Sequence, residues 1–400
     1  MSIAECESGR RIADTEAVKT PGESLRGFRW NNLAIYLAAV ATAVYTGFRL
    51  PLLWATTFQA VSLQDGFYRR FLIGTVLQPF AALFGYSYWF YTGVTFLALA
   101  ILLTALGVVF VRAPLSGRSV LIVVWLLFPT GGFWFNEAGY LDQFLYLGLL
   151  AALWLRSRQR VWAAAAVMAL TPLVHEIAAL TVMPVYAFVV LTEEPRVKRA
   201  IAMLVPACVT GAVMLLDRPA AADAIDRSRR RLAHTDWKPR PDVYEVFTRT
   251  PKQAWHLYSI HGIMVINLPM IVLAVGGFWL LHLIGKKTPD LHWTHAALAT
   301  AAAGGPTLLA FAGWDAMRWG YILATNFCLV MWLWWGWHER NGSPFQMTTL
   351  QWVVLIGLLL VASRTPFAYL ETNPRIIDWN GVADFLHAVH NGTMFRIPPF

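Results

Sequence analysis

The sequence VWAAAAVMALTPLVHEIAALTVMPVYAFVVL, at residues 161–191, sets the topology expected for this chain. It is apolar apart from a short interruption, TPLVHE, at 171–176. A helix needs about 20 apolar residues to cross the hydrocarbon of a bilayer, so this segment is long for one crossing and short for two. It either crosses a membrane once or turns back near His175 as a short helical hairpin.

The distribution of basic residues favours the hairpin. With a hairpin, eleven basic residues of short loops fall on the same side as the N-terminus: Arg112, Arg118, Arg156, Arg158, Arg160, Arg196, Lys198, Arg199, Lys286, Lys287 and Arg340. The short loops on the other side, 136–140 and 313–318, hold only Arg318. Because short cytoplasmic loops are enriched in Lys and Arg, we expect the first side to be cytoplasmic.

Composition extends this interpretation to all 400 residues. Hydrophobic residues make up 57% of the chain and charged residues 14%, against roughly 25% charged in ordinary soluble domains. Inside a bilayer the backbone amides have no water partner, so crossing segments form helices. We predict an all-α, polytopic transmembrane helical bundle of about 10–11 membrane segments, near residues 32–53, 88–111, 119–135, 140–155, 161–191, 199–216, 263–284, 293–312, 319–337 and 348–363.

The expected organisation has three parts: a cytoplasmic N-terminal tail at 1–30, a transmembrane domain at 31–363 and an outer-face segment at 364–400. The transmembrane domain includes outer loops at 54–87 and 217–262. A cleavable signal peptide would place an apolar stretch nearer the start, so the first span is expected to stay uncleaved. The net charge of +9 is scattered over short loops, which argues against a nucleic-acid partner. The three cysteines are far apart and give neither a disulfide framework nor a zinc spacing.

Ionisable residues gather on the expected outer face: Asp65, Arg69, Arg70, Glu137, Asp142, His175, Glu176, Asp315 and Arg318. Ionisable groups at membrane depth are costly, so each is a candidate for function. Local ion pairs are the alternative for Asp65 with Arg69 and for Asp315 with Arg318. A hairpin turn that satisfies its own backbone, or a solvated turn, would explain the others. Their convergence predicts one polar cavity that opens to the outside.

Missing motifs narrow the chemistry of this cavity. The chain has no phosphate-binding GxxxxGK[ST] loop, no GxGxxG and no DxD, so a nucleotide-driven pump or a nucleotide-sugar enzyme has no recognisable site. It also has no GxSxG or HExxH sequence. A reaction on the outer face then needs a substrate that arrives through the bilayer, and a sugar on a polyprenyl phosphate fits. Guanidinium groups bind its phosphate, and a carboxylate acts as base toward an acceptor hydroxyl.

The layout resembles the GT-C superfamily of membrane glycosyltransferases, which use polyprenyl-phosphate sugars. The stretch from Asp65 to Gly85 matches their first outer loop, in which an acidic residue is followed by helices along the membrane surface. The sequence FNEAGYLD at 135–142, followed by an apolar helix and Arg-Ser-Arg at 156–158, is similar to a turn in several bacterial members. One departure is Gly66, where the family often has a second acidic residue. Glu137, Asp142 or Glu176 therefore stay open as the base.

The resemblance implies a glycosyltransferase of the bacterial inner membrane with a cytoplasmic N-terminus. Asp65 is then expected to deprotonate the acceptor, and Arg69 with Arg70 to hold the donor phosphate. The remaining candidates would line the cavity, and the basic loop 217–262 would cover it or grip an anionic acceptor. Expected partners are a lipid-linked sugar donor, membrane lipid, and a cell-envelope glycan, lipid or protein as acceptor. No cofactor is expected, and a divalent metal stays open.

Two alternatives remain. A surface-polysaccharide polymerase or ligase handles lipid-linked oligosaccharides with similar arginines on the outer face. A multi-pass transporter would place its polar groups on broken helices at matching positions of two repeats. Only one broken segment, near residues 171–176, is visible in the sequence.

Overall fold

A computed structural model describes most of the chain, and its described part is helical with no strand. It covers residues 29–66, 69–113, 117–127, 129–193, 196–216, 219–248, 293–311, 315–340, 348–350, 352–354, 357, 375 and 377–397. The predicted segment at 263–284 and most of those at 1–30 and 348–363 lie outside these residues.

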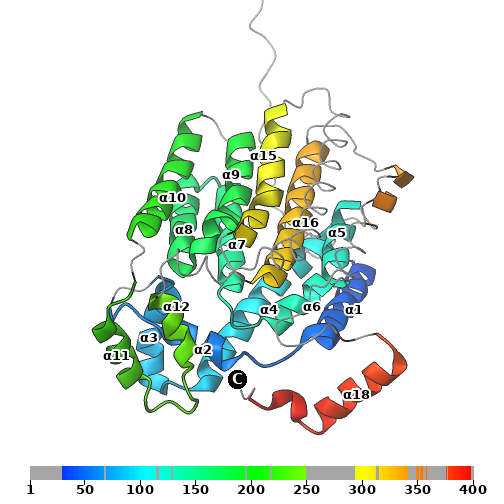
Figure 1. Cartoon of the computed structure of the whole chain (residues 1–400). Helices are drawn as coiled ribbons and strands as arrows, with labels where there is room; N and C mark the ends of the chain where they lie inside the picture. Colours follow the sequence, from blue (N-terminus) through cyan, green and yellow to red (C-terminus); the bar gives the residue numbers. More distant parts are fainter. Residues whose placement is uncertain are drawn as a thin grey trace, which may run out of the picture.

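Long helices form a bundle, and short helices gather at one end of it (Figure 1). The bundle contains α1 Trp30–Gly47, α4 Tyr88–Arg112, α5 Gly117–Leu127, α6 Pro129–Asn136, α7 Asp142–Ser157, α8 Val161–Val174, α9 Val182–Glu193, α10 Arg196–Leu216, α15 Trp293–Gly304 and α16 Ala316–Arg340. The short helices at its end are α2 Leu53–Ala60, α3 Leu72–Phe84, α11 Ala222–Arg231 and α12 Pro241–Thr248.

One apolar core runs through the bundle and fixes the helices relative to one another. Phe110 of α4, Leu145 of α7, Tyr186 of α9 and Trp334 of α16 are among its buried members. Many outward side chains of the same helices are large and apolar, such as Leu97 of α4, which is 61% exposed. A helix that is apolar on all sides is typical of a bundle surrounded by lipid.

Two described helices are long and apolar enough to cross a membrane, Tyr88–Arg112 and Val197–Leu216. A third crossing results if 118–127 and 130–136, which meet at a bend of 53°, form one broken span. The segment predicted at 119–135 is therefore two helices, α5 and α6. Gly131 explains the tight turn, because a Cβ there would lie 2.2 Å from the Leu126 carbonyl oxygen.

The segment at 161–191 turns back. Helix α8 ends at Val174, Glu176–Ala179 form a short 3-10 turn and α9 begins at Val182. The turn contacts the loop before α3, at the end of the bundle with the short helices. Helix α9 leads away from this end. Helix α10 begins three positions after α9 ends and runs 21 residues back to the end with the short helices. At 1.5 Å per residue, the 12 residues of α9 place its far end about 18 Å from the turn. The arrangement is the hairpin geometry that the basic residues favoured.

The first predicted span, 32–53, ends earlier than expected. Helix α1 stops at Gly47, and residues 48–52 form no regular secondary structure before α2 begins at Leu53. Two causes act here: Pro51 lacks an amide hydrogen, and Gly47 packs directly against the backbone of α6. The expected outer loop at 54–87 is formed mainly by α2 and α3.

The C-terminal segment contains α18 Trp379–His390, with a short 3-10 turn at Thr393–Phe395. Arg375 donates to the Tyr45 carbonyl oxygen at 3.0 Å, and the rings of Tyr45 and Phe385 meet edge to face at 5.3 Å. These contacts hold α18 beside the end of α1, at the same end of the molecule as the short helices (Figure 1).

Candidate functional site

Three stretches far apart in the sequence meet at one small cavity. Arg70 from the loop before α3, His175 from the α8–α9 turn and Arg318 from the start of α16 line it, together with Trp54, Ala55, Phe58, Gly139, Tyr140 and Leu141. The cavity has a volume of about 10 Å³, which is roughly the space of one water molecule. We call the end of the bundle that carries it the polar end. The expected meeting of residues 65–70, 175–176 and 315–318 is found for these three side chains.

Arg70 and Glu176 form the first ion pair of the polar end. The Arg70 Nε donates to the two carboxylate oxygens at 3.1 and 2.9 Å, and its Nη2 donates to Oε1. The Nη1 of Arg69 lies 3.9 Å from the same Oε1, and its Nη2 donates to the Val246 carbonyl oxygen at 2.9 Å. One carboxylate thus faces two guanidinium groups.

The α8–α9 turn presents Glu176 because the backbone leaves the helix at His175. His175 is extended, with φ −160° and ψ 131°. Its Nδ1 accepts from the Ile177 amide at 3.3 Å and so caps the 3-10 turn. The same Nδ1 lies 3.1 Å from Oε2 of Glu176. Arg70 has a positive φ of 65°, a conformation that costs a non-glycine residue roughly 1–2 kcal/mol.

The charges of this turn are set by its surroundings. Burial, and then the Arg70 guanidinium, lowers the pKa of His175 to about 4. Burial alone would raise the pKa of Glu176, but Arg70 and His175 outweigh it and hold that pKa well below its ordinary value. Near neutral pH the turn therefore carries an ionised carboxylate beside a neutral imidazole.

Arg318 and Asp142 form the second ion pair. The Arg318 Nε and Nη2 donate to the two Asp142 oxygens at 2.7 and 2.6 Å, and both side chains are buried. Asp142 opens α7, where the helix dipole favours a negative charge. Asp315 lies 3.5 Å from Arg318, and the Tyr140 ring lies 4.8 Å from its guanidinium. The local Asp315–Arg318 pair exists, but Asp142 is the closer partner.

Asp65 does not line the cavity. Its side chain is only 4% exposed, and both carboxylate oxygens accept from Arg231 of α11. Arg227 of α11 donates to the Asp65 carbonyl oxygen at 2.7 Å, and Arg231 also donates to the Ala60 carbonyl oxygen at 2.8 Å. Burial lowers the pKa of Arg231, but the Asp65 carboxylate more than compensates and raises it. Two arginines expected to cover the site or grip an acceptor thus hold Asp65 in place.

Glu137 belongs to a neighbouring contact. Its Oε1 lies 3.7 Å from Nη2 of Arg49, whose Nε donates to the Asn136 carbonyl oxygen at 2.7 Å. Arg49 is not among the residues predicted from the sequence, although its place two residues before Pro51, at the end of an apolar stretch, was a usable signal. Tyr140 was also missed as a site residue, yet it packs on Trp54 at 5.2 Å and lines the cavity.

The arrangement can bind anions in place of its own carboxylates. Arg70 and Arg318 each form a two-oxygen contact with a carboxylate, which is the geometry that guanidinium groups also use for phosphate. Among the described residues no group of three or more His, Cys, Asp or Glu side chains is placed to hold a metal ion. No family model matches the chain, and neither a curated protein nor a solved structure matches it.

Proposed function

We propose that this chain is a polytopic glycosyltransferase of the bacterial inner membrane, with its polar end on the outer face and its N-terminus in the cytoplasm. It would move a sugar from a polyprenyl-phosphate donor to an acceptor hydroxyl of a cell-envelope glycan, lipid or protein. One observation supports this most: Arg70, His175 and Arg318, from three distant parts of the chain, line one cavity.

The donor phosphate is assigned to Arg69 and Arg70. Both guanidinium groups already face one anionic group, the Glu176 carboxylate. A phosphate has more acceptor oxygens than a carboxylate and accepts the same paired hydrogen bonds, so it can displace Glu176. The positive φ of Arg70 supports this assignment, because strained backbone is concentrated at binding and catalytic sites.

The catalytic base is also a carboxylate that must first be released from its arginine. Asp65 is buried under α11, so an acceptor hydroxyl reaches it only when Arg231 withdraws. We therefore propose that α11 moves when the acceptor binds and that Asp65 then takes the proton. Glu176 is the second candidate, because phosphate binding at Arg70 releases it beside the neutral His175.

The test is transfer by the purified full chain in liposomes that contain polyprenyl-phosphate monosaccharides. Asp65→Asn removes the base and is expected to lower kcat by roughly 100-fold or more. Arg70→Lys keeps the charge but loses the two-point contact, so it is expected to raise KM for the donor. Asp226→Asn, on the exposed face of α11, is the matched control and should keep full activity.

Each alternative has its own outcome. Full activity of Asp65→Asn, with loss in Glu176→Gln, would move the base to Glu176. Product formation from oligosaccharide donors alone would identify a polymerase or ligase. Solute uptake without any covalent product would contradict glycosyl transfer altogether.

A further inference from the structure

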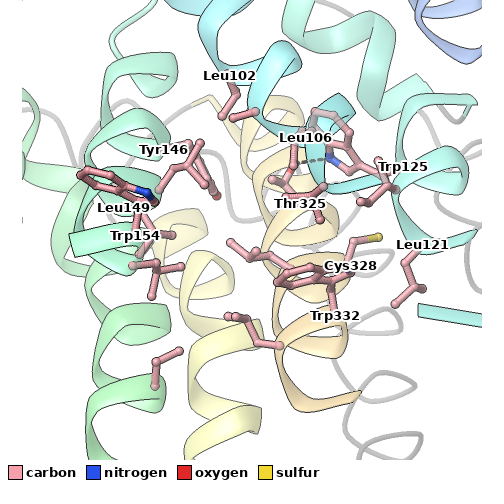
Figure 2. Close-up of a pocket in the computed structure, with 18 of the residues that line it drawn as sticks. Leu102, Leu106, Leu121, Trp125, Tyr146, Leu149, Trp154, Thr325, Cys328 and Trp332 are labelled. Carbon is pink, nitrogen blue, oxygen red and sulfur yellow. Dashed lines mark hydrogen bonds between the residues drawn. The ribbon is translucent and has the colours of Figure 1, made fainter. Parts of the chain in front are cut away.

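A second cavity lies inside the bundle, away from the polar end. It has a volume of about 390 Å³ and is walled by α4, α5, α7 and α16 (Figure 2). Its lining is mostly leucine, valine and tryptophan, including Leu106, Leu149, Trp154 and Trp332. The size is that of an ordinary ligand pocket. Helix α4 is one of the two described helices that are long and apolar enough to cross a membrane, so we expect lipid acyl chains to surround it.

The cavity has two different ends. At one end Trp125 and Trp134 both donate to the Thr325 hydroxyl, at 3.0 and 3.3 Å, so the polar atoms there are paired with one another. At the other end the lining residues are Arg118, Arg156 and Ser157. Figure 2 shows the order along the walls, from Tyr146 to Trp154 on α7 and from Thr325 to Trp332 on α16.

Arg118 and Arg156 lie far from the small cavity at the polar end. Asp142 begins α7 and Arg156 lies near its end, while Arg318 lies in the first turn of α16 and Trp332 lies further along it. At 1.5 Å per residue each step is about 20 Å. Arg118 is held at this level, because its Nε donates to the Trp332 carbonyl oxygen at 3.0 Å and its guanidinium lies 3.9 Å from the Trp332 ring centre. We call this the basic end of the cavity.

The basic end favours an anion. Two guanidinium groups line it, those of Arg118 and Arg156. A guanidinium binds phosphate through paired hydrogen bonds, and a basic residue near an anionic membrane surface contributes about 1 kcal/mol to lipid binding. The apolar walls match a hydrocarbon chain, whose burial is worth about 0.8 kcal/mol per methylene group.

We propose that this cavity binds one anionic glycerophospholipid from the leaflet at the basic end. One acyl chain occupies the space between α4, α7 and α16, and the phosphate contacts Arg118 and Arg156. The site is separate from the candidate active site at the polar end and does not depend on glycosyl transfer.

Native mass spectrometry of the full chain tests the proposal. The protein is incubated with phosphatidylglycerol, phosphatidylcholine or a polyprenyl phosphate, and retained lipid is counted. We expect phosphatidylglycerol to be retained roughly tenfold more tightly than phosphatidylcholine, and the Arg118→Gln/Arg156→Gln double variant to lose this preference. The matched control is Arg160→Gln, which alters an exposed arginine outside the lining.

A second pair of variants tests the position of the lipid's acyl chain. Ala105→Phe fills the cavity from α4 and should abolish retention of one tightly bound lipid. Ile101→Phe adds the same ring to the exposed face of α4 and should not. A phosphatidylglycerol with a photoreactive acyl chain should label peptides of α7 and α16 in the unaltered protein and in Ile101→Phe, but not in Ala105→Phe.

Three results would overturn the proposal. Equal retention of both phospholipids by every variant would mean that the protein retains only annular lipid, bound without specificity around the bundle. Retention of polyprenyl phosphate alone would assign the cavity to an isoprenoid ligand. Labelling that is unchanged in Ala105→Phe would place the lipid on the outer surface of the bundle.

Discussion

Arg318 and Asp142 make a buried ion pair in which each partner depends on the other. Both side chains are less than 10% exposed, and two hydrogen bonds join them. The net contribution of such a pair to stability is small, since both charges lose their hydration. Removing one partner leaves a buried charge without compensation and costs about 3–5 kcal/mol.

We predict that Arg318→Gln lowers the free energy of unfolding by about 3–5 kcal/mol. The double variant Asp142→Asn/Arg318→Gln should recover part of this loss, because the Asp142 carboxylate is then no longer left buried without its arginine, although Asp315 still loses its contact. Thermal unfolding of the purified protein in detergent measures both, with the exposed Arg160→Gln as control. Equal stability of Arg318→Gln and Arg160→Gln would contradict the pairing.

The lowered pKa of His175 predicts how the free energy of unfolding depends on pH. Its pKa is about 4 in the folded chain, against an ordinary value of 6.5. Between these values the unfolded chain holds a proton that the folded chain does not. The contribution of His175 to folding stability is therefore fully present above pH 6.5. It decreases as the pH falls toward 4, by up to about 1.4 kcal/mol per pH unit.

We expect His175→Gln to have a shallower loss of stability than the unaltered protein between pH 6.5 and about 4. Unfolding midpoints measured across this range are the readout, and His390→Gln, at an exposed position of α18, is the control. Identical pH profiles for His175→Gln and His390→Gln would exclude His175 as the titrating group.

At the scale of elements, helix α11 is attached to the first loop by a few polar contacts. Arg227 and Arg231 reach Asp65 and Ala60, while Arg230 on the same helix is exposed. Helix α11 contributes only Ala224 and Ile225 to an apolar cluster, so these bonds supply much of its attachment. Elements with few buried apolar contacts open at the lowest free energy.

We predict that Arg231→Met releases α11 and exposes residues 219–248 to protease. The arginine is lost while the length of its apolar stem is nearly kept, so packing changes little. Limited proteolysis of the purified protein, followed by mass spectrometry, should show faster cleavage in this region. Arg230→Met should cleave at the original rate, and equal rates in the two variants would mean that apolar packing holds α11.

A close crossing fixes α1 against α6. A Cβ added at Gly47 would lie 1.8 Å from the Gly132 carbonyl oxygen, so one helix has to shift. We predict that Gly47→Ala destabilises the protein by about 1–3 kcal/mol. Gly93→Ala in α4 meets no atom within 4 Å and should be neutral or stabilising by about 0.5–1 kcal/mol. Thermal unfolding compares them, and two equal midpoints would contradict the crossing.

For the whole molecule, the hairpin determines which loops share a side. Arg160 before α8 and Lys198 near the start of α10 both lie at the end of the bundle remote from α11. Asp226 lies on α11, at the polar end. In a membrane, the first two positions should therefore be on one side and the third on the other.

Cysteine labelling tests this arrangement. In a background with Cys6→Ser, Cys208→Ser and Cys328→Ser, the variants Arg160→Cys and Lys198→Cys should react with an impermeant maleimide only from the cytoplasmic side. Asp226→Cys should react only from the outer side. Labelling of Arg160→Cys and Lys198→Cys from opposite sides would show that residues 161–191 cross once.

Local patterns predicted the helices well. The segment at 88–111 is α4 almost to the residue, and the turn expected near His175 lies there, directly after α8, which includes residues 171–174. The end of the first span was wrong by six residues. Two of the causes lie in tertiary structure or backbone chemistry that hydropathy does not measure: the Gly47 crossing and the missing amide of Pro51.

The sequence alone determined the helical class and the residues that carry charge near the membrane, because apolar runs and the demand for internal backbone hydrogen bonds are local properties. Only the tertiary structure decided which charges meet. Asp65 had Arg69 four residues away, yet its partner is Arg231, 166 positions later. Asp142 pairs with Arg318 across 176 positions. Many arginines are chemically equal partners for one carboxylate, and the packing of the helices selects among them.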